Sequence, residues 1–177
     1  MGQHVSLASD ALSNALCVLA GLAERQIARI TDETLNRGLP AFLHEGIAGL
    51  NSGLMGAQVT ATAVLAEMRT SGAGSVQSIS TYGANQDVVA MGTIAARLTQ
   101  SKLIALFEIQ AIMALCVAQA IDIEMSKAAT KAFSPQALAL RDYTRSVSER
   151  LIGDRPLGSE ITELSSLMAQ NGPPQLP

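Results

Sequence analysis

The amino-acid sequence predicts an all-α fold, an elongated bundle of long helices. Apolar residues recur at helical spacing along most of the chain, and the stretch from about 87 to 127 has no proline and a single glycine. No run of useful length alternates apolar and polar residues as a strand does. The chain is 48% hydrophobic but only 3% aromatic, so its core is aliphatic and rich in small residues that let helices pack closely. We expect residues 1–177 to form a single helical domain.

The first helix is expected from residue 5 to about 30, where apolar side chains recur at steps of three and four. Glu24, Arg25 and Arg29 make its C-terminal end charged. A connection rich in glycine and proline follows over 31–46. The apolar positions of this helix are Val5, Leu7, Ala8, Ala11, Leu12, Ala15, Leu16, Leu19 and Leu22.

The second helix is expected from about 47 to 70, with an apolar stripe on one face. Gly49, Gly53 and Gly56 each weaken a helix by roughly 1 kcal/mol relative to alanine, so we expect them to serve close packing. A loop rich in glycine and serine follows over 71–84. The stripe consists of Leu50, Leu54, Ala57, Ala61, Val64, Leu65 and Met68.

The longest helix is expected to begin near Asp87 and to end near Lys127. Forty residues at 1.5 Å each would span about 60 Å, which suits an assembly better than one compact domain. Asp87 would meet the positive end of the helix dipole in the first turn. Asn85 and Gln86 would then lie where backbone N–H groups are unpaired and a polar side chain can face a ligand, although such a cluster is more often only a helix cap.

Two shorter helices complete the prediction. Ser134 and Pro135 are typical of an N-cap and first-turn proline, for a helix to about Leu151. Ser159 is expected to cap a last helix that ends near Gln170. Residues 172–177, which include three prolines, are expected to form a loose tail.

Composition argues against several classes of function. The net charge is −3 and the basic residues are scattered without interleaved aromatics, which argues against nucleic-acid binding. Cys17 and Cys116 lie in apolar runs and are interpreted as buried thiols, not as a disulfide or a metal site. No uninterrupted apolar run reaches the roughly 18 residues of a membrane span, and no signal peptide is recognised, so a cytoplasmic protein is expected.

The apolar excess indicates burial against other subunits. Charged residues make up only 15% of the chain, and the mean hydropathy is +0.27, which is high for a lone soluble domain. Such a surface is usually covered by a partner.

One segment, Asn85–Gly92 with the sequence Asn-Gln-Asp-Val-Val-Ala-Met-Gly, resembles the C-terminal active-site segment of a known family. This family comprises the aromatic amino acid ammonia-lyases and aminomutases, such as histidine, phenylalanine and tyrosine ammonia-lyase, which use the electrophile 4-methylidene-imidazol-5-one (MIO). The resemblance extends over nearly all of this chain, but it covers only the C-terminal third of a family member. The other matching stretches, in order, are 2–8, 23–29, 38–43, 49–55 and 154–157.

The resemblance implies the C-terminal portion of the ammonia-lyase (fumarase/aspartase-like) fold and a set of site residues. In the family the residue matching Gln86 sits beside the MIO and the substrate amine, and the one matching Asn85 supports that wall. The residue matching Phe42 lines the substrate pocket, although a lone loop phenylalanine can equally serve as an anchor to the core. Tyr82 departs from the Asn or Glu common in the family, and its larger ring would shorten the pocket. His44, two residues after Phe42, is assigned no catalytic role.

The family's remaining machinery is missing from this sequence. The MIO forms from Ala-Ser-Gly, and the nearest match here is Ala8-Ser9-Asp10. The catalytic tyrosine and the arginine that pairs with the substrate carboxylate lie upstream of the region that matches this chain. We therefore expect no cofactor and no metal in this chain, and an MIO on a partner, an N-terminal lyase-like subunit.

Two hypotheses follow. The first is a subunit of a split, heteromeric MIO-type aromatic amino acid ammonia-lyase or 2,3-aminomutase, because Met1 falls just before a family motif and the match runs to the family's natural end. The family forms tetramers around packed long helices, with each active site shared among subunits. The alternative is a non-catalytic helical assembly subunit derived from a lyase, or a different reaction in the same cavity.

Overall fold

The computed structural model describes residues 2–127 and 132–172, and within these ranges it contains helices and turns but no strand. The predicted all-α fold is confirmed. The elements are α1 (Gln3–Thr31), the short 3-10 helix η1 (Ala41–Leu43), α2 (Met55–Thr70), the 3-10 helix η2 (Gly74–Val76), α3 (Gly92–Met125), α4 (Pro135–Arg145) and α5 (Gly158–Asn171).

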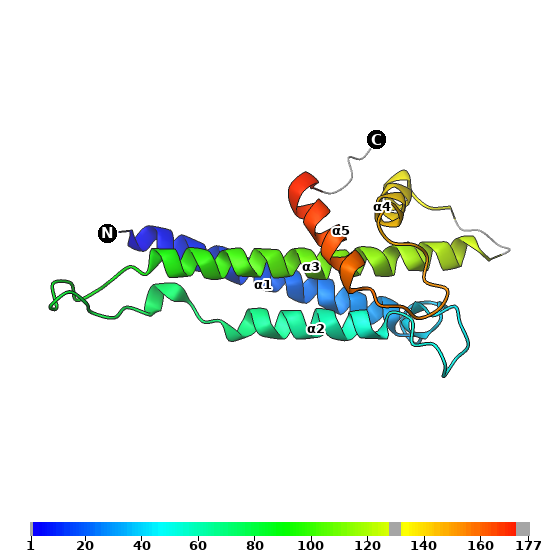
Figure 1. Cartoon of the computed structure of the whole chain (residues 1–177), viewed down its shortest axis with the longest axis horizontal. Helices are drawn as coiled ribbons and strands as arrows, with labels where there is room; N and C mark the ends of the chain where they lie inside the picture. Colours follow the sequence, from blue (N-terminus) through cyan, green and yellow to red (C-terminus); the bar gives the residue numbers. More distant parts are fainter. Residues whose placement is uncertain (1, 128–131, 173–177) are drawn as a thin grey trace.

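Helices α1, α2 and α3 lie side by side and form an elongated rod, while α4 and α5 pack on α3 over its C-terminal half (Figure 1). The helices approach closely because many of the residues between them are small. Ala20, Ala61 and Ala111 are completely buried, together with the branched side chains of Ile27 and Ile109. The aliphatic core predicted from the composition is therefore present along the rod.

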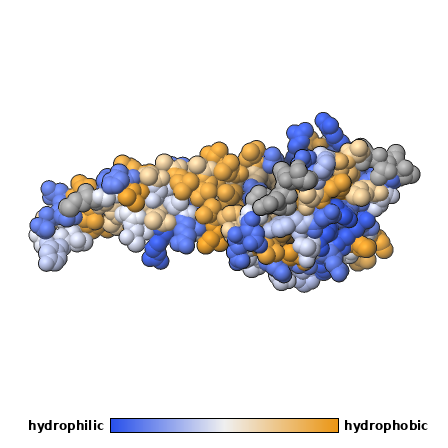
Figure 2. Space-filling model, turned by 90° about the horizontal axis from the view of Figure 1, so that it is seen from above, coloured by the Kyte–Doolittle hydropathy of each residue, from blue (hydrophilic) through white to orange (hydrophobic). Residues whose placement is uncertain are grey.

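Much apolar surface remains exposed on the rod, and Figure 2 shows it gathered over the middle of one face. Val18 and Leu22 of α1 and Ile104 of α3 are each more than half exposed. By length and composition alone, α1 and α3 would each qualify as a membrane-crossing helix, and 56% of the apolar stretch of α3 is buried inside the protein. Core helices of soluble proteins share these properties.

Helix α2 begins at Met55, so the predicted start near residue 47 is wrong. Gly49 and Gly53 have φ angles of 86° and 57°, in the left-handed region that glycine adopts without strain. A Cβ on Gly53 would stand 2.5 Å from the carbonyl oxygen of Phe42. Two of the three glycines that we expected to serve helix packing therefore lie in the turn before α2, and Gly53 lies directly against Phe42.

Helix α3 begins at Gly92, so the predicted start near Asp87 is also wrong. Met91 has a left-handed φ of 52°, which interrupts the helical backbone directly before Gly92. Asp87, Asn85 and Gln86 therefore lie in the preceding loop and not at the helix N-terminus. The expectation of a very long helix is confirmed, because α3 has 34 residues and rises about 51 Å.

The C-terminal helices differ from the prediction at one end each. The Ser134 side chain caps α4 by accepting a hydrogen bond from Ala137 N at 3.2 Å, as predicted. Helix α4 ends at Arg145 and not near Leu151, whose backbone is bonded to α3. Helix α5 starts at Gly158 without a side-chain cap, so Ser159 is not its N-cap. Of the predicted tail, 173–177 lies outside the described residues.

Candidate functional site

The site residues predicted from the sequence lie at two distant places in this chain. Tyr82, Asn85 and Gln86 lie in the loop 77–91, which extends beyond the end of the rod that holds the N-terminus (Figure 1). Phe42 lies in η1, next to Leu43, whose carbonyl oxygen accepts a hydrogen bond from Gln119 in the second half of α3.

The length of α3 measures the separation. From Gly92, where the loop ends, to Gln119, beside η1, the helix rises about 40 Å. A substrate the size of an amino acid is far shorter than this distance. One copy of the chain therefore does not bring Phe42 and Gln86 into a single pocket.

Two serine hydroxyls fasten the loop 77–91 across its width. Ser80 Oγ donates to the carbonyl oxygen of Gln86 at 3.0 Å, and the backbone N–H of Val89 donates to Ser78 Oγ at 2.8 Å. These bonds join the limb that leaves η2 to the limb that enters α3. The loop is thus shaped by local bonds although its residues from 77 to 88 are exposed.

The tip of the loop has an unusual backbone. Tyr82, Gly83 and Ala84 all have left-handed φ angles, of 58°, 65° and 59°. For a tyrosine and an alanine this conformation costs on the order of 1 kcal/mol or more each, and such residues cluster at functional sites. The side chains of Asn85 and Gln86 follow directly, exposed and without a hydrogen-bond partner in the described part of the chain. The ring of Tyr82 is 89% exposed.

Phe42 occupies a second strained corner. Its φ is 47° and that of Leu43 is 55°. The residues that lead into α2 hold this corner. Leu54 N donates to the carbonyl oxygen of Phe42 at 2.8 Å, and Gly53 leaves room for that oxygen because it has no side chain. The half-buried ring lines a cavity of about 350 Å³ together with Thr31 and Gln58.

A carboxylate joins this corner to the C-terminal part of the chain. Asp154 accepts hydrogen bonds from Ser52 N at 2.7 Å and from Gly53 N at 2.9 Å. These backbone N–H groups stabilise the ionised form and lower the pKa of Asp154 below its usual value. Three of the stretches quoted above, 38–43, 49–55 and 154–157, therefore meet in space. This contact was not predicted from the sequence.

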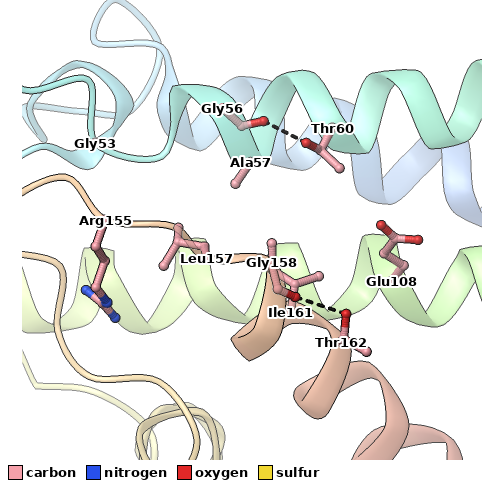
Figure 3. A pocket seen from close by; sticks show the side chains of 10 residues that line it. All are labelled: Gly53, Gly56, Ala57, Thr60, Glu108, Arg155, Leu157, Gly158, Ile161 and Thr162. Atoms are coloured by element: carbon pink, nitrogen blue, oxygen red, sulfur yellow. Dashed lines mark hydrogen bonds between the residues drawn. The ribbon is translucent and has the colours of Figure 1, made fainter.

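A second cavity, of about 370 Å³, lies between α2, α3 and α5 (Figure 3). Arg155 lines one end, but it is ion-paired with Glu160 at 2.9 Å. Glu108 projects from α3 at the other end and has no partner in the described part of the chain. Glu108 was not among the predicted site residues. It is the one charged residue between Lys102 and Asp122, and an isolated charge in so apolar a helix is a usable signal.

The buried polar groups on the other side of α3 serve the fold. Asp122 is 2% exposed and accepts charged hydrogen bonds from Arg141 Nε at 2.6 Å and Arg145 Nε at 2.7 Å, which fixes α4 against α3. The Asp122 carboxylate is thus paired within the chain. Among the described residues, no group of three or more His, Cys, Asp or Glu side chains is placed to hold a metal ion.

Comparisons with known proteins agree over almost the whole chain. The family model for aromatic amino acid lyases matches residues 1–146. A tyrosine ammonia-lyase from Cereibacter sphaeroides is 58% identical over 98% of this chain, and an MIO-dependent tyrosine 2,3-aminomutase from Streptomyces globisporus is 40% identical over 96%. The chain spans about a third of the length of these relatives, 33% and 31%.

Solved structures show the same likeness in three dimensions. The crystal structure of tyrosine aminomutase from Streptomyces globisporus superposes with a TM-score of 0.89 at 38% identity, covering 99% of this chain and 35% of that one. Histidine ammonia-lyase from Trypanosoma cruzi gives a TM-score of 0.84 at 33% identity, covering 93% of this chain and 31% of that one.

Proposed function

This chain belongs to the aromatic amino acid lyase family, and we propose that it is one part of a split, heteromeric ammonia-lyase or 2,3-aminomutase that acts on an aromatic amino acid. The observation that carries the proposal is the loop 77–91, in which the Asn85 and Gln86 side chains are exposed to solvent. Its backbone is strained at the tip and is held by two hydrogen bonds between its limbs. No hydrogen bond within the described chain involves these two amide side chains. A group presented in this way is suited to complete a site on another polypeptide segment.

The proposed roles follow from the chemistry of the side chains. The Gln86 amide both donates and accepts hydrogen bonds, so it can hold the amine or the carboxylate of a substrate without changing its charge. Asn85 supports this wall from the neighbouring position. Because one copy of the chain holds Phe42 far from Gln86, Phe42 would come from a second copy in the assembly. Its ring offers an apolar face to the aromatic ring of the substrate. Tyr82 limits the length of the pocket.

The MIO electrophile of the family activates an amine or an aromatic ring, and we assign it to a partner chain because this sequence has no Ala-Ser-Gly. The residues present fit a place beside such a group. Asn85 and Gln86 are neutral, exposed and unpaired, so they can approach an uncharged ring without a desolvated charge. The partner would be an N-terminal lyase-like subunit, and we propose the cytoplasm as the location of the complex.

One observation fits the alternative, a non-catalytic assembly subunit, as well as it fits the first proposal. Large apolar side chains remain exposed along α1 and α3, among them Val18, Leu22 and Ile104. They suit burial between packed helices whether or not the site is active. The two candidates therefore share an assembly and differ only in turnover.

Reconstitution separates the candidates. The chain is co-expressed with the part of the Cereibacter sphaeroides tyrosine ammonia-lyase that it does not match, and the purified complex is supplied with tyrosine, phenylalanine or histidine. Formation of a conjugated acid is followed by its cinnamate-type absorbance, and formation of a β-amino acid by chromatography. Turnover that requires both polypeptides supports the proposal. A stable complex with no turnover above either part alone favours the assembly subunit.

A further inference from the structure

Two glycines have no evident function within this chain. The sequence has 14 glycines, and most have a left-handed φ or a close neighbour where a Cβ would stand. Only Gly56 and Gly158 combine an ordinary negative φ with open space on that side. Alanine would be tolerated at both positions and would stabilise the chain by restricting the unfolded state.

Both glycines line the same cavity, the one between α2, α3 and α5 shown in Figure 3. Gly56 lies in the first turn of α2 and Gly158 begins α5. Their lack of side chains widens the gap between the two helices. Glycine at such a position commonly marks the close approach of another backbone.

Glu108 adds a charge to this cavity. Figure 3 shows its carboxylate rising from α3 toward α2, and it has no partner among the described residues. It also lines a third cavity, of about 350 Å³ and distinct from the one beside Phe42, which lies along α2 and α3 and is lined by Ser101 and Ile104. Glu108 lines both cavities, so they adjoin at this residue, and we call the two together the groove. An elongated groove suits a polypeptide segment better than a small molecule.

We propose that this groove docks a segment of the lyase polypeptide that this chain lacks, with its backbone against Gly56 and Gly158 and a lysine or arginine paired with Glu108. The relatives are about three times as long as the chain, so such a polypeptide exists in the family. A cation would match the unpaired Glu108 carboxylate, and the exposed apolar side chain of Ile104 lines the groove. The inference rests on the proposed function only in assuming that partner polypeptide.

The test measures binding rather than turnover. The full chain is titrated with the unmatched part of the Cereibacter sphaeroides tyrosine ammonia-lyase, and the dissociation constant is obtained by sedimentation. Gly56→Leu and Glu108→Lys should each weaken binding at least about tenfold, because one fills the groove and the other repels the basic residue. Gly72→Ala and Glu163→Lys are the matched controls, since both residues lie outside the groove, and they should bind like the wild type.

The variant Gly56→Ala distinguishes a loss of docking from a loss of folding. In the isolated chain this variant should melt at the same temperature or up to about 4 °C higher, yet it should bind the partner more weakly. Groove variants that bind within twofold of the wild type, or a wild-type chain that does not bind the probe, would overturn the proposal. Tight binding without turnover would count against the proposed function and leave the docking inference intact.

Discussion

Asp154 and Gly53 lie 101 positions apart in the sequence, yet the Asp154 carboxylate accepts a hydrogen bond from the Gly53 backbone N–H at 2.9 Å. The same carboxylate also binds Ser52 N. Gly53 in turn makes room for the carbonyl oxygen of Phe42. The proposed substrate-facing corner therefore depends on a residue from the far end of the chain.

Replacing Asp154 with alanine should lower the thermal midpoint by a few degrees. The hydrogen bonds lower the pKa of Asp154, so the folded pKa lies below the unfolded one. Its contribution is fully present above the unfolded value near pH 3.9 and is lost as the pH falls through the folded value. Circular dichroism melts at pH 7 and pH 3 should show a gap in thermal midpoint between wild type and variant that is smaller at pH 3. Asp87→Ala, an exposed carboxylate, is the control, and a gap of equal size at both pH values would contradict the prediction.

Gln119→Ala should destabilise the fold strongly. The buried Gln119 amide donates to Leu151 O at 2.8 Å and accepts from Leu151 N at 3.0 Å, and Arg145 also donates to it. Its loss leaves buried groups unpaired, at about 1–3 kcal/mol. Urea unfolding should show a lower midpoint with an unchanged slope, whereas Gln100→Ala, an exposed position on the same helix, should not differ from the wild type.

Ser78→Ala should loosen the loop that carries Gln86. The Val89 N–H donates to Ser78 Oγ at 2.8 Å, and losing a hydrogen bond worth about 1 kcal/mol should speed its exchange roughly fivefold. Hydrogen exchange of the Val89 amide measures the change, and Ser78→Thr, which keeps the hydroxyl, should restore protection. Equal exchange rates in all three proteins would show that this bond does not order the loop.

Gln86→Ala should slow the reconstituted enzyme by about 5- to 150-fold, the equivalent of 1–3 kcal/mol of lost transition-state stabilisation. Tyr82→Asn should instead change which aromatic amino acid is accepted, because it removes the ring that limits the pocket. Both are measured as kcat/KM on the substrate panel given above. Unchanged rate and substrate choice in both variants would place the active site elsewhere.

The Cys116 thiol should resist alkylation in the folded protein. Burial raises its pKa to about 12 because the thiolate would lose its hydration. Mass spectrometry after treatment with iodoacetamide at pH 8 should show Cys116 unmodified until urea unfolds the chain. Modification of Cys116 at the rate of a free peptide thiol would mean that α3 opens readily.

Local pattern alone determined the helical architecture. The periodic apolar positions of α1 and the long stretch without proline in α3 predict helices because their spacing follows the 3.6-residue repeat. The pattern did not decide which face is covered within the chain, since of the apolar positions predicted for α1 only Leu16 is buried here. The Ser134–Pro135 cap of α4 was also predictable, since it depends on neighbouring residues only. The family followed from short ordered motifs in the same way.

Contacts between distant residues decided what the pattern could not show. Gly53, in a left-handed turn before α2, lies against Phe42 and is bonded to Asp154. Beyond the end of α4, Gln119 binds the backbone of Leu151, where a further helical turn was predicted. The sequence also names Phe42 and Gln86 as site residues, but only the length of α3 shows that one chain holds them apart. These outcomes depend on hydrogen bonds and steric contacts between residues far apart in sequence, which no local periodicity encodes.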